Sequence, residues 1–234
     1  MEKIKKANLL WLLTFCIEIV LLIIEFKTIR RNTKEIICLV FMNGFNGIMI
    51  CAVLLPIYAI LICINIKNNM YFSKLLNYGS RANWLSNIYK NNFVITVKYV
   101  LLLLLPYSIL SFVGCINSRT IIDIIYIMFT IISYIVAFYM LSFVIVALKL
   151  KWNNDILAIG SCIIICVLPF ISFREISNCS ISTFLNAGNF FINYKYVWAY
   201  HEVAIVIMLL VTFLFFKGAT YLVKKIDLLW REKE

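Results

Sequence analysis

The chain has 234 residues, of which 64% are hydrophobic and 14% are charged, whereas a soluble domain is about half apolar with about a quarter of its residues charged. This balance excludes a water-soluble globular domain and predicts one membrane domain over residues 1–234. The net charge of +11 does not indicate a nucleic-acid-binding protein, because the basic residues lie in short loops between apolar segments and form no long basic stripe.

Six apolar segments follow one another along the chain, each long enough to cross a bilayer as a helix. A crossing needs about 20 apolar residues, because each helical residue rises about 1.5 Å and lipid offers the backbone no hydrogen-bond partner. The sequence therefore predicts an all-α, polytopic integral membrane protein with six transmembrane helices. The predicted spans are residues 8–26, 36–64, 94–114, 124–148, 156–173 and 203–222.

The basic residues between these spans indicate their orientation. Lys3, Lys5 and Lys6 precede the first span, whose apolar run is too long for a signal peptide and ends without a small-residue cleavage site. With both termini cytoplasmic, about twice as many basic residues lie inside as outside, which is the distribution that the positive-inside rule favours. The basic cluster at residues 27–34 opposes this orientation, but the total supports it.

Glu18 lies near the middle of the first span, where an ionisable group is costly unless it is paired, hydrated or neutral. Asn43 and Asn46 reach the same depth in the antiparallel second span, and Gly44 and Gly47 let the two helices approach closely. The sequence predicts a hydrogen bond between Glu18 and one of these asparagines. Two roles stay open: the contact fixes the helix pair, or it lines a hydrated path or a binding site for a cationic peptide.

Residues 67–93 form the cytoplasmic connection between the second and third spans. Apolar and aromatic residues recur there at mixed helical spacing, with basic residues between them and a glycine–serine stop behind them. This pattern predicts a short amphipathic helix. Its apolar and aromatic residues are Tyr71, Phe72, Leu75, Leu76 and Tyr78, the basic residues are Lys74 and Arg81, and the stop is Gly79 and Ser80. A second amphipathic segment follows along the interface, with Trp84 at headgroup depth. Alternatively, both segments are interfacial anchors only.

The same region resembles a known family. Pro56 lies near the inner end of the second span, Phe72 follows it, and the element YGSRANW occupies residues 78–84 before a long apolar span. Over residues 56–106 this layout resembles permease subunits of ABC transporters, and more closely the type-2 permeases that accompany bacteriocin, lantibiotic and other peptide exporters or immunity systems. The single tryptophan in this element and the short segment before the first span depart from the commoner pattern.

The resemblance implies a permease subunit in a bacterial plasma membrane that exports a peptide-like substrate. Its implied partners are an ABC ATPase subunit, a second permease copy or similar permease subunit, and membrane lipid. By resemblance, Leu75, Leu76 and Tyr78 pack into the ATPase. Lys74 and Arg81 pair with its acidic groups. The residues that the resemblance assigns to coupling are Phe72, Lys74, Leu75, Leu76, Tyr78, Gly79, Arg81 and Trp84.

The extracellular loop at residues 174–202 is rich in aromatic residues, which form either short re-entrant helices at an outer gate or a plain aromatic belt. Cys115 and Cys179 fall in outer loops, and whether they form a disulfide stays open.

No catalytic constellation is present in the sequence. His201 is the only histidine, no glycine-rich phosphate loop occurs, and the cysteines lack metal-ligand spacing. Glu18, Asp123 and Glu202 are single carboxylates at different depths, which disfavours acid–base pairing. The sequence predicts a non-enzymatic subunit without a cofactor or metal of its own. The alternatives are a non-transporting membrane scaffold or bacteriocin immunity protein and, second, an intramembrane enzyme.

Overall fold

The structure, a computed structural model, describes residues 2–29, 53–70, 80–114, 121–172 and 197–225. Its regular elements in these ranges are helices, because only a helix lets a continuous apolar run satisfy its own backbone donors and acceptors. The prediction of an all-α fold is confirmed for this part of the chain. The helices are α1 (Glu2–Ile29), α4 (Leu55–Asn69), α6 (Arg81–Gly114), α7 (Ile121–Trp152), α8 (Asp155–Ser172) and α11 (Val197–Lys225).

Two helices differ from the spans that the sequence predicts. α4 runs beyond the predicted span at 36–64 to Asn69, and Pro56 lies in its first turn, where proline needs no intrahelical donor. The earlier part of that span lies outside the described residues, as do Asn43 and Asn46. α6 begins well before residue 94, because no glycine or proline interrupts the chain between Arg81 and that position. The expected interfacial segment and the third span are therefore one continuous helix.

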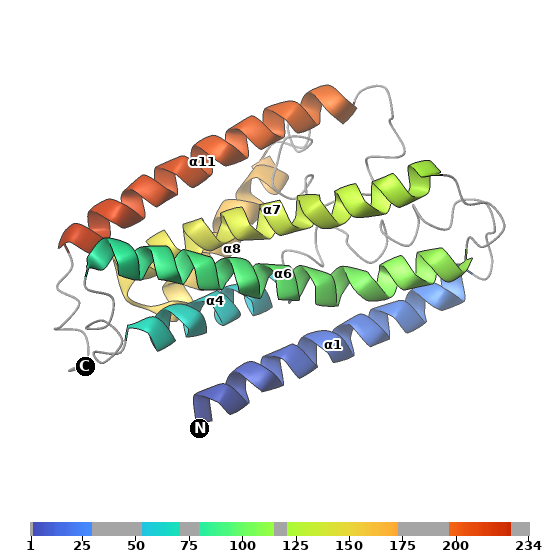
Figure 1. Ribbon diagram of the computed structural model, residues 1–234, viewed down its shortest axis with the longest axis horizontal. Helices are drawn as coiled ribbons and strands as arrows, with labels where there is room; N and C mark the ends of the chain where they lie inside the picture. Colours follow the sequence, from blue (N-terminus) through green and yellow to red (C-terminus); the bar gives the residue numbers. More distant parts are fainter. Residues whose placement is uncertain (1, 30–52, 71–79, 115–120, 173–196, 226–234) are drawn as a thin grey trace.

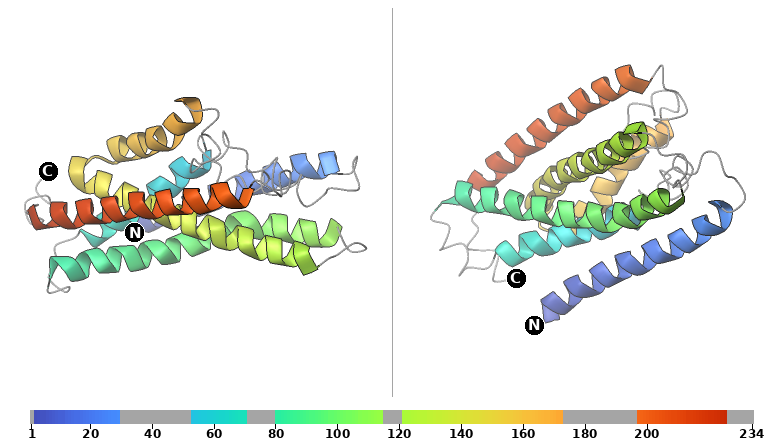
Figure 2. Two further views of the ribbon diagram at one scale, coloured as in Figure 1. Left: turned by 90° about the horizontal axis from the view of Figure 1, so that it is seen from above. Right: turned by 45° about the vertical axis from the view of Figure 1, so that its right-hand side comes forward.

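The helices lie side by side along one long axis (Figure 1). α7 is central and packs against α4, α6, α8 and α11, while α1 packs against α4 and α6. Figure 2 shows the same bundle from two further directions. The N-terminal end of α1 and the C-terminal end of α11 lie toward the same end of the bundle.

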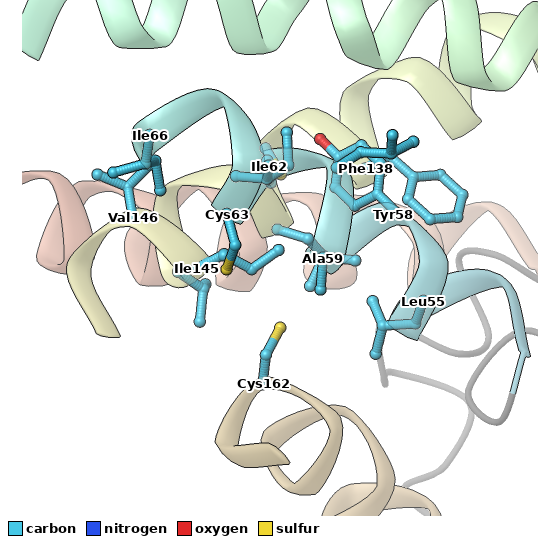
Figure 3. Packing of buried hydrophobic residues seen from close by; sticks show 14 of the residues in the cluster. Leu55, Tyr58, Ala59, Ile62, Cys63, Ile66, Phe138, Ile145, Val146 and Cys162 are labelled. Carbon is cyan, nitrogen blue, oxygen red and sulfur yellow. The ribbon is translucent and has the colours of Figure 1, made fainter. Parts of the chain in front are cut away.

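A continuous apolar core fills the space between α4, α6, α7 and α8. Figure 3 shows the part of this core between α4, α7 and α8. The sulfur atom of Cys63 on α4 faces that of Cys162 on α8. Tyr58 is fully buried there, and its ring meets that of Phe138 edge-on with centroids 5.0 Å apart. Aromatic packing of this kind adds to the interhelical contact beyond simple area burial.

A tight turn joins α7 to α8. Asn153 has a φ of 52°, a left-handed conformation that asparagine tolerates better than most residues. Asn154 then caps α8 by accepting a hydrogen bond at 2.9 Å from the backbone N–H of Ile156. The ammonium group of Lys149 lies 2.6 Å from the carboxylate of Asp155, across the turn. These contacts fix the two helices as an antiparallel pair.

Two described helical stretches are long and apolar enough to cross a membrane: Arg81–Pro106 in α6 and Tyr134–Trp152 in α7. The stretches Asn8–Val20 and Asp155–Ile165 are apolar but shorter. Length and composition alone do not separate a spanning helix from the core helix of a soluble protein, so the direction in which the side chains face is the more informative property.

The side chains of α1 have the reverse of the usual amphipathic arrangement. Among its described side chains, Thr14 and Glu18 are fully buried and Asn8 near the start is exposed, whereas Leu9 and Leu12 are each 62% exposed. α8 and α11 also carry large apolar side chains on their outer faces, and Ile156 at the start of α8 is 79% exposed. A helix in water places its polar side chains outward, and α1 does the opposite.

Candidate functional site

The first turn of α6 carries two of the residues that the resemblance assigns to coupling, Arg81 and Trp84. Ser80 begins this turn: its hydroxyl accepts a hydrogen bond from the backbone N–H of Asn83 at 3.2 Å, and its carbonyl accepts one from Trp84 at 3.1 Å. A serine cap of this kind satisfies donors that the helix itself leaves unpaired. From this fixed turn, Arg81 and Trp84 reach the ends of two different helices.

Trp84 reaches the end of α4. Its side chain is 1% exposed, and its indole N–H donates a hydrogen bond at 2.7 Å to the carbonyl of Asn69, the last residue of α4. The carbonyls of a last helical turn have no intrahelical donor, so the indole satisfies one of them. Trp84 therefore lies inside the bundle, because α6 begins early enough to bury it against α4. Its headgroup depth stays a prediction.

Arg81 reaches the end of α11. Its Nη1 donates hydrogen bonds to the carbonyls of Val223 and Lys224 at 3.3 and 2.7 Å. These carbonyls belong to the last turn of α11, where the helix dipole is negative and a guanidinium is favourable. The expected pairing of Arg81 with acidic groups of a partner stays a prediction, while its contact within the chain is with α11.

A row of hydrogen-bonding side chains continues from this joint along the contact between α4 and α6. We call it the polar seam, and its residues are Tyr58, Asn65, Asn69, Asn92, Thr96 and Tyr99. At the Trp84 end, Asn69 Nδ2 donates to the Oδ1 and the carbonyl of Asn65 at 3.0 and 2.8 Å. Asn65 Nδ2 in turn donates to Asn92 Oδ1 at 2.7 Å, which links the two helices.

The polar seam continues deeper between the same two helices. Thr96 Oγ1 donates to the carbonyl of Asn92 at 2.7 Å, which uses its only hydrogen. The Tyr58 hydroxyl, 2.7 Å from Thr96 Oγ1, is therefore the donor in that pair. Tyr99 donates to the carbonyl of Leu54 at 2.7 Å. Hydrogen bonds of this type each contribute about 1 kcal/mol or less, so the seam specifies register more than it adds stability.

Glu18 lies next to the deep end of the polar seam. It is fully buried on the inward face of α1, the helix that packs against α4 and α6. Trp11 of the same helix packs against the Tyr99 ring, with centroids 6.2 Å apart. The predicted hydrogen bond from Glu18 to Asn43 or Asn46 involves residues outside the described part of the chain and stays a prediction.

The chemistry available at this site is that of amides, hydroxyls, one indole and one guanidinium. Such groups join helices and orient polar ligands. Among the described residues, no three His, Cys, Asp or Glu side chains lie together as a set that could hold a metal ion.

The structure brings together only part of the site that the sequence predicts. Arg81 and Trp84 share one helical turn. The other residues assigned to coupling lie outside the described ranges, and their roles stay predictions: Phe72, Lys74, Leu75, Leu76, Tyr78 and Gly79. Cys115, Cys179 and most of the loop at 174–202 also lie outside them, although α11 already begins within the last part of that loop.

Sequence reasoning did not find the polar seam. The signal was present as polar residues at i and i+4 on two neighbouring helices, Asn65 with Asn69 and Asn92 with Thr96. Each pair lies close to a predicted span end, where polar residues are ordinary, so neither pair indicated a contact on its own.

Comparison with protein-family models, with curated proteins and with solved structures finds no match to this chain.

Replacing Glu18 by glutamine is expected to leave thermal stability in detergent within about 1 kcal/mol of wild type, because the amide keeps the volume and hydrogen-bonding capacity of the carboxyl. Glu18→Ala should lower stability more, since it opens a cavity beside Tyr99. Thermal unfolding followed by size-exclusion chromatography measures both variants. Equal losses in the two variants would mean that the carboxyl group itself, rather than packing, holds α1 in place.

Proposed function

We propose that the chain is a multi-pass protein of the bacterial plasma membrane with six spans. The reversed arrangement of α1 supports this proposal, because buried Thr14 and Glu18 with exposed Leu9 and Leu12 suit a helix whose outer face meets lipid. The apolar outer faces of α8 and α11 support it in the same way. In lipid, the long stretches of α6 and α7 then act as spans and not as the core of a soluble domain.

The basic end of the bundle faces the cytoplasm in this proposal, and so do both termini. The ends of α4, α7 and α11 and the start of α6 lie at one end of the bundle (Figure 1), and exposed basic residues occur at each of them. The positive-inside rule assigns such a side to the cytoplasm. These exposed basic residues are Lys67, Arg81, Lys151, Lys224 and Lys225.

At this cytoplasmic side, the chain acts as the permease subunit of an ABC transporter that exports a peptide-like or other amphipathic substrate. The observation that carries this function is the joint at the first turn of α6. Trp84 connects this turn to α4, and Arg81 connects it to α11. A displacement of the chain just before Ser80 is therefore transmitted to α4, α6 and α11 together. A permease driven by an external ATPase requires such a connection. A second permease copy or a similar subunit completes the transporter.

Affinity purification of the chain from its native membrane in mild detergent is the decisive experiment. Mass spectrometry is expected to find an ABC ATPase subunit in stoichiometric amount. Clear absence of any ATPase would contradict the permease function and favour the alternative, a non-transporting membrane scaffold or bacteriocin immunity protein.

The substitution Leu76→Asp is expected to reduce ATPase co-purification at least tenfold, because a charge placed in an apolar protein contact costs on the order of 1.4 kcal/mol or more. Lys151→Asp is the matched control, since it places the same charge on the same side of the bundle but away from the coupling segment. Quantitative immunoblotting of the co-purified ATPase measures both. Undiminished co-purification in the Leu76 variant would place the docking contact elsewhere without contradicting the permease function.

A further inference from the structure

We propose that Arg81 is a positioning residue that fastens the end of α11 to the start of α6, so that a conformational change at the ATPase reaches α11. This inference rests on the proposed function for the source of the movement. The contact itself belongs to the described structure and is testable without the ATPase.

The position of Arg81 is unfavourable for its own helix. It is the first residue of α6, where the helix dipole is positive, and the first turn of α6 contains no acidic residue to offset it. Acidic residues are the favoured choice in the first turn of a helix. The guanidinium is therefore stabilised from outside α6, by its two hydrogen bonds to α11.

The end of α11 benefits from the same contact. Val223 and Lys224 expose carbonyls of the last turn, and a cation that donates hydrogen bonds to them also stabilises the negative end of the dipole. Val223 is 2% exposed, so this turn is seated against the bundle and not loose in solvent. The Arg81 guanidinium thus joins the start of α6, where a cation is unfavourable, to the end of α11, where a cation is favourable. Arg81 and Val223 are 142 residues apart in the sequence.

The two ties from the first turn of α6 differ in strength. Trp84 is buried and holds α4 within the core, whereas the Arg81 side chain is exposed and its hydrogen bonds to α11 are made to backbone carbonyls. α11 otherwise packs mainly on α7, with an aromatic contact between Phe216 and Tyr89 of α6 at 5.8 Å between centroids. Removal of Arg81 should therefore release the end of α11 and leave the pairing of α4 with α6 intact.

Hydrogen–deuterium exchange of the peptide that covers the last turn of α11 tests the contact on the isolated chain in nanodiscs. Arg81→Ala is expected to accelerate exchange in that turn at least fivefold, which corresponds to the low end of the usual range of coupling free energies. Arg81→Lys should restore part of the protection, because it keeps a cationic donor but lacks the planar fork. Lys90→Ala removes another exposed cation of α6 and should change nothing. Exchange in Arg81→Ala equal to wild type would overturn the contact.

The same measurement on the complex with its ATPase tests the transmission. In wild type, exchange in the last turn of α11 should differ between the nucleotide-free and the vanadate-trapped states. The difference should vanish in Arg81→Ala, return in part in Arg81→Lys and persist in Lys90→Ala, each compared in samples that hold equal amounts of co-purified ATPase. A difference that survives in Arg81→Ala, or that is missing in wild type, would overturn the transmission. A chain that purifies with no ATPase overturns the proposed function and the transmission together, while the isolated chain still decides the contact.

Discussion

Replacement of Trp84 by alanine is expected to lower the free energy of unfolding in detergent micelles by about 3 kcal/mol, the low end of the range for large aromatic residues in protein cores, because the detergent already supplies apolar surroundings. The side chain is 1% exposed, so its removal leaves a cavity between α4 and α6. It also removes the indole donor from the carbonyl of Asn69. Equilibrium unfolding in mixed micelles measures the loss.

Two variants separate the causes of this loss. Trp84→Phe keeps much of the ring but not the N–H, and should cost about 1 kcal/mol from the hydrogen bond. Trp152→Ala removes a tryptophan that is 38% exposed at the end of α7, and should cost far less than Trp84→Ala. Equal costs for the two alanine variants would mean that Trp84 is not buried inside the bundle.

Tyr58→Ala is expected to have an effect of similar size, about 3 kcal/mol, because the ring is the centre of an aromatic cluster in the core. Its centroid lies 5.3 Å from that of Tyr99 and 5.0 Å from that of Phe138, and its hydroxyl donates to Thr96. The same unfolding experiment applies. Tyr221→Ala is the control, since that tyrosine is 56% exposed on α11.

The hydroxyl of Tyr58 makes a separable contribution. Tyr58→Phe should lower the free energy of unfolding by about 1 kcal/mol. The double variant Tyr58→Phe, Thr96→Val should lose less than the sum of the two single variants, because both hydroxyls of the hydrogen bond are removed together. Additive costs would mean that the two hydroxyls do not interact and would contradict the register of the polar seam.

The sequence was sufficient to predict the helices but not which helices pack against one another. Five of the six apolar runs lie almost entirely within α1, α6, α7, α8 and α11, since helix formation in apolar segments depends on local composition and on the absence of breakers. The early start of α6 followed from the same local rules, but the aromatic and polar residues near Trp84 were interpreted as an interfacial segment. Their burial depends on α4, which no local pattern reveals.

The polar contacts of the site were decided by tertiary structure. Glu18 was recognised because a carboxylate is rare within an apolar run, and its burial agrees with that reasoning. Asn65 and Asn92 were overlooked, because each is ordinary until the antiparallel packing of α4 and α6 brings their amides to 2.7 Å.

Composition and apolar periodicity by themselves determined that this protein is all-helical over its described residues and that its helices are apolar enough to suggest a membrane. Only the tertiary structure decided that Glu18 lies on the inward face of α1, that Trp84 hydrogen-bonds to the end of α4, and that Arg81 hydrogen-bonds to the end of α11. The reason is that a helix forms from hydrogen bonds between residues four positions apart. The partner of an exposed guanidinium or a buried indole, in contrast, depends on how all the helices pack together.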